Sequence, residues 1–258
     1  MVRIKDVYDY LDSVAPFATQ ADFDNSGFLV GDPERYVQHI GVVLDITSQT
    51  LNQARRLGVD LIVSHHPVIF EAKKSFTAKD MAFELASAGI AAICAHTSLD
   101  AAPGGVNDVL AQLLGVKKVE PFPTAEYPSG LVRVGFLPFS SGAELAEFVG
   151  DTLFSEVRYY DAGRAIETVA ICGGNGGSLT EEIAEAGIDA FITGECTYHR
   201  FLEAAEKSMT VIAAGHFETE NPVVEALAAK LKAKFLNAEV SVLEQDLITD
   251  VYLPDLLR

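Results

Sequence analysis

The sequence contains few cysteines, few basic residues and no long apolar run, and each shortage argues against a class of protein. Its three cysteines, Cys94, Cys172 and Cys196, form no CxxC pair, which argues against a disulfide framework and favours buried thiols in a reducing cytoplasm. No run approaches the roughly 20 apolar residues of a membrane span. The first residues also lack the apolar core of a signal peptide. We therefore expect a cytoplasmic protein with no membrane partner.

Basic residues are outnumbered by acidic residues, 19 against 37, which gives a formal net charge of −18 at pH 7. Proteins that bind nucleic acid carry a basic surface, and the sequence contains no basic stripe and no basic patch interleaved with aromatic residues. Nucleic acid is therefore not expected as a partner. Lys73 and Lys74, which follow a His-His-Pro motif, leave open a local basic pocket for a small phosphate ligand.

Two adjacent histidines, His65 and His66, follow the apolar run 61–64, which is typical of a buried parallel strand. Open α/β sheets place their ligand sites at the carboxyl ends of such strands, and neutral imidazole is a common metal ligand. The alternative interpretation is a pair of capping or core histidines, because the dipeptide alone is not specific.

Further histidines follow other predicted strands in a repeated pattern. His96 and His216 each follow an apolar run, and each precedes a carboxylate by four residues, Asp100 and Glu220 respectively. Side chains four positions apart lie on one face of a helix, so each pair can approach one metal ion. This recurrence favours a metal site over capping or core histidines.

Another predicted strand ends in Glu195, with His199 four residues later and Cys196 as a weaker ligand candidate. Imidazoles and carboxylates that converge at strand ends form a mixed nitrogen and oxygen site, which suits Zn, Fe or Mn. The presence of more than four candidate ligands predicts two divalent metal ions, and paired ions are a common device of hydrolases.

The two halves of the chain contain a similar pattern. Residues 53–66 and 182–195 each read as the end of an amphipathic helix, a glycine stop at Gly58 or Gly187, and a buried strand. Strands that alternate with helices predict right-handed crossovers and parallel pairing. Any two βαβ units look alike, but Gly-[Val/Ile]-Asp and His-x-x-x-carboxylate also recur in register. The predicted fold class is α/β, with two similar three-layer α/β domains related by an internal repeat and the metal site between them.

The 258 residues suffice for two modest α/β domains. We expect residues 1–124 and 215–258 to form the first domain, which carries most of the metal ligands, and residues 125–214 to form the second, after a proline-rich linker at 121–128. Other predicted elements are helices over residues 4–15 and 142–153 and strands over residues 131–137 and 156–161. A glycine-rich turn at 173–177 predicts a close backbone approach between the halves, with phosphate binding as the alternative.

Six motifs resemble, in order, those of one widespread family, the GTP cyclohydrolase I type 2 homologues, also described as Nif-three-like proteins. The resemblance runs from about residue 3 to about residue 240. The motifs are DNSGFLVGD at 24–32, SHHPVIF at 64–70, AHTSLD at 95–100, GGVND at 104–108, TGE at 193–195 and GHFETE at 215–220.

The resemblance implies a dinuclear metal site with the ligands His65, His66, Asp100, His216 and Glu220. It leaves His96 as a residue that supports the ligands or transfers a proton, and thus as the candidate catalytic residue. It further implies two α/β domains and a toroidal homohexamer whose metals face an internal cavity. Residues 245–258 extend past the expected family pattern and are a candidate packing or subunit-contact tail.

Two functions remain open at this stage. The first is a metal-dependent hydrolase of a small molecule, such as a nucleotide or a pterin-like compound, in which His96 or His199 relays a proton. The second is a non-catalytic metal-binding scaffold, chaperone or regulatory interaction protein. An open coordination position beside a solvent-filled pocket favours the enzyme, and a closed, fully protein-ligated site favours the scaffold.

Overall fold

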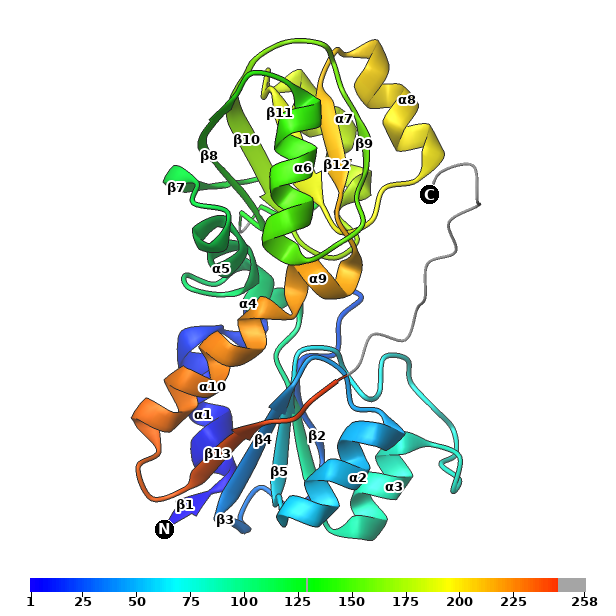
Figure 1. Ribbon diagram of the computed structural model, residues 1–258. Helices are drawn as coiled ribbons and strands as arrows, with labels where there is room; N and C mark the ends of the chain where they lie inside the picture. The colour runs from blue at the N-terminus through cyan, green and yellow to red at the C-terminus, as the bar shows by residue number, and fades with distance from the viewer. Residues whose placement is uncertain (129, 246–258) are drawn as a thin grey trace, which may run out of the picture.

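The computed structural model describes residues 1–128 and 130–245. Two large sheets lie apart, with the short helices α4 (Thr97–Ala101) and α9 (His216–Glu220) between them (Figure 1). The fold class is mixed α/β, as predicted. Residues 246–258, most of the predicted tail, lie outside the described residues. Among the described helices, none is both long and apolar enough to cross a membrane.

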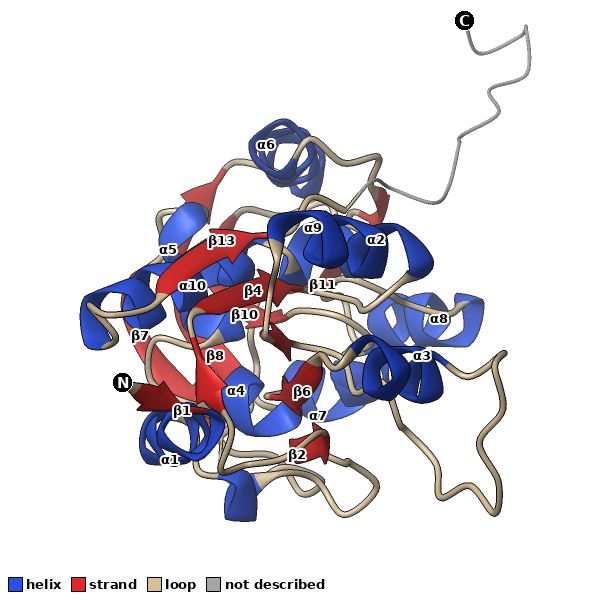
Figure 2. Cartoon of the chain, turned by 90° about the horizontal axis from the view of Figure 1, so that it is seen from below, coloured by secondary structure: helices blue, strands red, loops and turns tan. Residues whose placement is uncertain are grey.

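The first large sheet has the order β13-β4-β5-β6-β2, in which β2 runs antiparallel to β6 and the other pairs are parallel. Its strands are β2 (Gly27–Val30), β4 (His39–Val43), β5 (Leu61–Ser64), β6 (Ala91–Cys94) and β13 (Glu239–Val242). Helices cover both of its faces (Figure 2). Those on one face are α2 (Ser48–Leu57) and α3 (Met81–Ala88), and those on the other are α1 (Ile4–Val14) and α10 (Pro222–Lys234).

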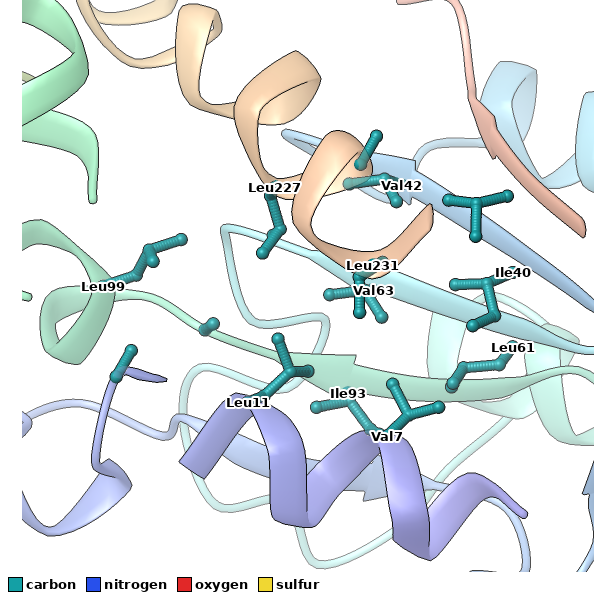
Figure 3. Close-up of a cluster of buried hydrophobic side chains, with 14 of the residues drawn as sticks. Val7, Leu11, Ile40, Val42, Leu61, Val63, Ile93, Leu99, Leu227 and Leu231 are labelled. Carbon is teal, nitrogen blue, oxygen red and sulfur yellow. The ribbon is translucent and has the colours of Figure 1, made fainter. Parts of the chain in front are cut away.

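The core of this sheet follows from the alternation of side chains along a strand. Val42, Val63 and Ile93 pack with α1 and α10 (Figure 3), whereas Val43 and Ile62 pack with α2 and α3. Because both faces are covered, the central strands β5 and β6 are almost entirely apolar, as buried parallel strands usually are. The predicted strand at 61–64 is confirmed as β5, and the predicted helix at 4–15 is confirmed as α1.

The second large sheet has the order β7-β8-β10-β11-β12-β9. Its strands β10, β11 and β12 are parallel, and the outer strands pair antiparallel. The strands are β7 (Lys117–Phe122), β8 (Val132–Phe139), β9 (Arg158–Tyr160), β10 (Ile166–Cys172), β11 (Ala190–Thr193) and β12 (Thr210–Ala213). The helices packed on it are α5 (Val106–Leu113), α6 (Gly142–Leu153), α7 (Thr180–Glu185) and α8 (Tyr198–Glu206).

Strand β7 is an element that the sequence pattern did not predict. Only its last two residues, Pro121 and Phe122, fall within the segment predicted as a linker, and it pairs with β8 at the edge of the sheet. Pro121 lies within it, and proline is tolerated in an edge strand because one side of that strand has no ladder hydrogen bonds to lose. Pro121 therefore belongs to an edge strand, whereas residues 123–128 lie outside any helix or strand.

A small strand pair and two short 3₁₀ helices lie outside the two large sheets. Strands β1 (Val2–Arg3) and β3 (Tyr36–Val37) form an antiparallel pair, and short 3₁₀ helices occupy Phe17–Thr19 and Gly177–Leu179. The predicted left-handed glycines are confirmed, since Gly58 has φ 70° and Gly187 has φ 76°.

Candidate metal centre

The carboxyl ends of the two sheets meet at one cluster of imidazoles and carboxylates. His65 and His66 directly follow β5, and His96 lies two residues after β6. His216 and Glu220 lie at the two ends of α9, which follows β12 of the other sheet. The strand-end pattern in the sequence therefore brings these side chains together from elements that belong to different sheets.

The Glu220 carboxylate lies at the centre of the cluster. Its Oε2 atom is 2.9 Å from Nε2 of His66 and 3.1 Å from Nε2 of His216. The same oxygen is 3.7 Å from Nε2 of His65, which in turn is 3.5 Å from Oδ1 of Asp100. Three imidazoles thus direct Nε2 towards one carboxylate oxygen.

The Nδ1 atom of each of these three imidazoles is held by an acceptor outside the cluster. His65 donates to the carbonyl oxygen of Ala95 at 2.9 Å. His66 donates to Asp45 at 2.7 Å, and His216 donates to Glu195 at 2.7 Å. An acceptor at Nδ1 fixes the orientation of the ring and leaves Nε2 for a ligand, as in many metal sites.

His96 has the same arrangement. Its Nδ1 donates to Oδ1 of Asp24 at 2.8 Å, and the Asp24 side chain is fully buried. Asp24 also accepts from the backbone N–H and the hydroxyl group of Thr97 and from the hydroxyl group of Ser26. The ring of His96 lies 5.2 Å from that of His65 and 5.4 Å from that of His66, measured between centroids. His96 is therefore a fixed member of the cluster wall.

Two buried atoms of the cluster have no hydrogen-bond partner among the residues that the structure describes. They are Nε2 of His65 and Oδ1 of Asp100, whose side chains are 1% and 12% exposed. Buried polar atoms are usually paired, so an unpaired one requires an explanation. Here Nε2 of His65 and Oδ1 of Asp100 face each other. An imidazole nitrogen and a carboxylate oxygen are both common metal ligands.

The titration of the cluster reflects its mixture of charges. Burial lowers the pKa of His66, but the hydrogen bonds to Asp45 and Glu220 outweigh burial and raise the pKa to about 10. The hydrogen bond to Glu220 raises the pKa of His216 to about 9. Burial raises the pKa of Asp100 to about 6. Without a metal ion, the carboxylates thus favour the protonated forms of His66 and His216, and burial favours the protonated form of Asp100.

The glycine-rich turn at 173–177 packs against the cluster. A Cβ atom on Gly174 would lie 2.0 Å from Oε1 of Glu220, and the residue has φ 61°. Its N–H donates to Thr219 Oγ1 and its carbonyl accepts from the N–H of Glu195. The turn therefore provides the predicted close approach of backbone, because only glycine leaves room for Glu220.

The structure separates the other sequence candidates from the cluster. His199 is exposed on α8, where its ring lies against Tyr198. The Cys196 thiol donates to the Thr197 carbonyl oxygen, and none of the metal-ligand groups found among the described residues includes either side chain. Lys73 pairs with Asp80 on the exposed loop after the His-His-Pro motif.

The sequence did not predict that Asp45, Asp24 and Glu195 accept hydrogen bonds from the imidazoles. Asp45 lies two residues after β4, at the same sheet edge as His66, so its position relative to the strand was an available signal. For Asp24, which lies in a turn far from His96 in the sequence, the pattern contained no such signal.

A cavity of about 560 Å³ opens beside the cluster. His66, His96, Asp100, His216 and Glu220 line one end of it. The remaining wall combines the glycine-rich turn and mainly apolar or aromatic side chains with the polar residues Thr97, Glu126 and Ser178, and it includes Phe23, Phe70, Tyr127, Leu131, Leu179, Gly173 and Gly176. The size lies within the usual range of small-molecule pockets.

Comparisons with known proteins identify the family of the chain. The family model described as Duf34/NIF3 (NGG1p interacting factor 3) matches residues 2–250. A relative from Clostridium acetobutylicum is 31% identical over 241 residues, and the match covers 90% of this chain and 90% of the relative. A relative from Lactococcus lactis is 32% identical over 241 residues, with 90% of this chain and 92% of the relative covered. Both are named GTP cyclohydrolase 1 type 2 homolog.

Solved structures show the same fold. Staphylococcus aureus hypothetical protein SA1388 has a TM-score of 0.89 at 24% identity, covering 97% of this chain and 99% of that one. A protein of unknown function, ybgI, has a TM-score of 0.84 at 27% identity and 96% and 100% coverage. Reduced HcgD from Methanocaldococcus jannaschii has a TM-score of 0.82 at 26% identity, with 95% and 98% covered. The predicted resemblance is thereby confirmed, and the chain belongs to the Duf34/NIF3 family.

Proposed function

We propose that the cluster binds two divalent metal ions and that the protein is a metal-dependent hydrolase of a small molecule. The observation that supports this most directly is that Glu220 belongs to two potential ligand groups, one with His65 and Asp100 and one with His66 and His216. Within each group the ligand atoms lie within 4.8 Å of one another. A carboxylate common to two groups favours two ions, which Glu220 would help to hold.

The residues present match the needs of such ions. The unpaired atoms of His65 and Asp100 lack a partner that a cation would provide. The acceptors at Nδ1 of His65, His66 and His216 leave Nε2 of each ring available as a ligand. Three imidazoles with two carboxylates suit Zn, Fe or Mn better than Mg, which prefers oxygen ligands.

Divalent ions in such a site lower the pKa of a bound water and stabilise negative charge on the attacked group. The residues of the chain supply the remaining functions. Asp24 holds Nδ1 of His96, so Nε2 of His96 is the atom placed to accept or donate a proton at the cavity wall. His66 and His216 are 22% and 37% exposed, and they give a small molecule access to the cluster.

The alternative function is a non-catalytic metal-binding scaffold. It is supported by the origin of the ligands, because His65 and His66 follow one sheet and His216 and Glu220 follow the other, so that ions would join the two sheets. The cavity favours the enzyme, because a purely structural site is usually closed by protein ligands. The relatives' name suggests a nucleotide or pterin-like substrate class, and this class is the first to be tested.

The experiment that tests the proposal is metal analysis of the purified protein beside a hydrolysis screen. We expect about two Zn, Fe or Mn ions per chain in the wild type and a loss of at least one in Glu220→Gln. Glu218→Gln, on the same short helix but outside the ligand groups, is the matched control. Wild-type protein that binds two ions and turns over no phosphate ester, cyclic amide or nucleotide would favour the scaffold. A metal content unchanged in Glu220→Gln would refute the site.

We further propose the larger organisation that the sequence pattern predicts. In this proposal residues 1–124 and 215–258 form one domain, residues 125–214 form the second, and the two descend from one repeated βαβ unit. The protein would act in the cytoplasm as a homohexamer, since closed symmetry is the rule for soluble oligomers. Light scattering tests the assembly, and a monomer at micromolar concentration would contradict it.

A further inference from the structure

We propose that the cavity beside the cluster takes a ligand with a flat aromatic ring and at most one phosphate group. The inference rests on the proposed metal site for the position of the reacting group. The wall that receives the ring is a separate part of the cavity and can be tested without metal.

Aromatic rings form a continuous path from the cluster to the cavity mouth. The ring of His96 lies 6.2 Å from that of Phe70, and the ring of Phe70 lies 6.3 Å from that of Phe23, measured between centroids. All three side chains line the cavity. Phe23 and Phe70 are 53% and 50% exposed, so each presents a ring to the cavity that a planar ligand can cover.

The other cavity walls also suit a ring rather than a polar chain. Leu131 and Leu179 contribute apolar surface, and Tyr127 contributes a third aromatic side chain. A planar ring that packs on such walls buries apolar area on both faces. The cavity volume of about 560 Å³ accommodates a bicyclic ring together with a small polar group at the metal end.

The charges around the cavity disfavour a polyanion. No lysine or arginine is among the described residues that line it, and Lys73 is paired with Asp80 on an exposed loop. Five carboxylates surround the imidazoles, so two divalent ions would not give the cluster a net positive charge; they are Asp24, Asp45, Asp100, Glu195 and Glu220. Glu126 adds a further carboxylate to the outer wall.

These observations distinguish the proposed ligand from a nucleoside triphosphate. A triphosphate is normally bound by lysine, arginine or a glycine-rich loop at the start of a long helix. The turn at 173–177 leads instead into α7, which spans Thr180–Glu185, and Gly174 is packed against Glu220. A ring compound with no phosphate or with a single phosphate group brings less negative charge to this cavity than a triphosphate does.

The test is saturation-transfer NMR with four probes: guanosine, GMP, GTP and ribose 5-phosphate. We expect guanosine and GMP to bind with the strongest transfer at ring protons, GTP to bind no more tightly than GMP, and ribose 5-phosphate to bind much more weakly. The double variant Phe23→Leu with Phe70→Leu should bind guanosine roughly tenfold more weakly, the size expected for the loss of ring stacking. Phe83→Leu, a partly exposed phenylalanine on α3 outside the cavity, is the matched control.

Each series is repeated on metal-loaded and chelator-treated protein. Guanosine binding that persists without metal and weakens in the double variant supports the ring wall even if the metal proposal fails. The inference is overturned if no ring compound binds, if GTP binds at least tenfold more tightly than GMP, or if ribose 5-phosphate equals GMP. Should the double variant fold poorly by circular dichroism, the comparison of the four probes on wild-type protein decides.

Discussion

The Nε2 atom of His66 lies 2.9 Å from Oε2 of Glu220, although 154 positions of sequence separate the two residues. His66 follows β5 of the five-stranded sheet, and Glu220 ends α9, which follows β12 of the six-stranded sheet. The contact therefore joins the carboxyl ends of the two sheets. Any change that moves either side chain is expected to open the cluster.

Removal of a single imidazole should remove metal without unfolding the chain. We expect His65→Ala and His66→Ala each to lose most of the bound metal, because each ring contributes Nε2 to a different ligand group with Glu220. Elemental analysis measures the metal, and circular dichroism verifies the fold. His199→Ala, which removes an exposed imidazole on α8, should keep the wild-type metal content. Wild-type metal in both site variants would refute the strand-edge site.

The glycine at position 174 should be required for metal binding because of space rather than backbone conformation. In Gly174→Ala the new Cβ would lie 2.0 Å from Oε1 of Glu220, which must move that carboxylate out of place. Gly163→Ala provides the matched control, since its φ is 70° and no atom of the described residues lies within 4 Å of its Cβ position. Both variants incur the strain of a left-handed alanine, about 1 kcal/mol. We expect a lower metal content in Gly174→Ala alone.

The carboxylate behind His66 should tune metal affinity from outside the ligand set. Asp45 accepts from Nδ1 of His66, and Gln245 donates to Asp45 at 2.7 Å. We expect Asp45→Asn to weaken metal binding by roughly 10–100-fold, as is typical for the loss of such a supporting carboxylate. Competition with a chelator of known affinity measures the change. The control Asp9→Asn removes an exposed carboxylate paired with Lys5, and an equal effect in both variants would contradict the prediction.

The stability of metal-free protein should fall as the pH rises. The folded chain raises the pKa of His66 to about 10 and that of His216 to about 9, from an ordinary value of 6.5. The folded state thus binds these protons more tightly than the unfolded state. The resulting stabilisation is fully present below about pH 6.5 and is lost as the pH rises through 9 to 10.

We therefore expect the Tm of chelator-treated protein to decrease between pH 7 and pH 10. Metal-loaded protein should decrease less, because an ion replaces the protons on the same rings. Thermal unfolding followed by circular dichroism at constant ionic strength measures both curves. Parallel curves for the two forms would show that the imidazoles do not titrate as described.

Much of the fold is encoded in local patterns, and these were read correctly. The apolar run before His65 predicted β5, and the glycines at 58 and 187 predicted the ends of helices. The pattern failed where tertiary pairing outweighs composition. The segment that begins at Lys117 contains a proline and polar side chains, yet it forms β7 because β8 offers it an unpaired edge.

The site was predictable to the extent that its members follow strands. His65, His66 and His216 each stand directly at or just past a strand end, and parallel strands place such residues at one edge. The pairing of Asp24 with His96 across 72 positions could not be predicted in the same way, because it depends on how a turn from one segment packs over another. Contacts of this kind are fixed by the assembled fold and leave no periodic trace in the sequence.

The hydrogen bonds between Gln245 and Asp45 also bear on the order of events during synthesis. A ribosome releases the chain from its N-terminus, so His65, His66 and Asp100 emerge long before Glu220, with which they share potential ligand groups in the finished cluster. Gln245, which accepts from the Asp45 N–H and donates to its carboxylate, emerges later still. The cluster is consequently complete only after nearly the whole chain has been synthesised. In the proposed metal site, unfinished chains that end before His216 hold three of the five ligands, so we expect metal to be acquired late in biosynthesis.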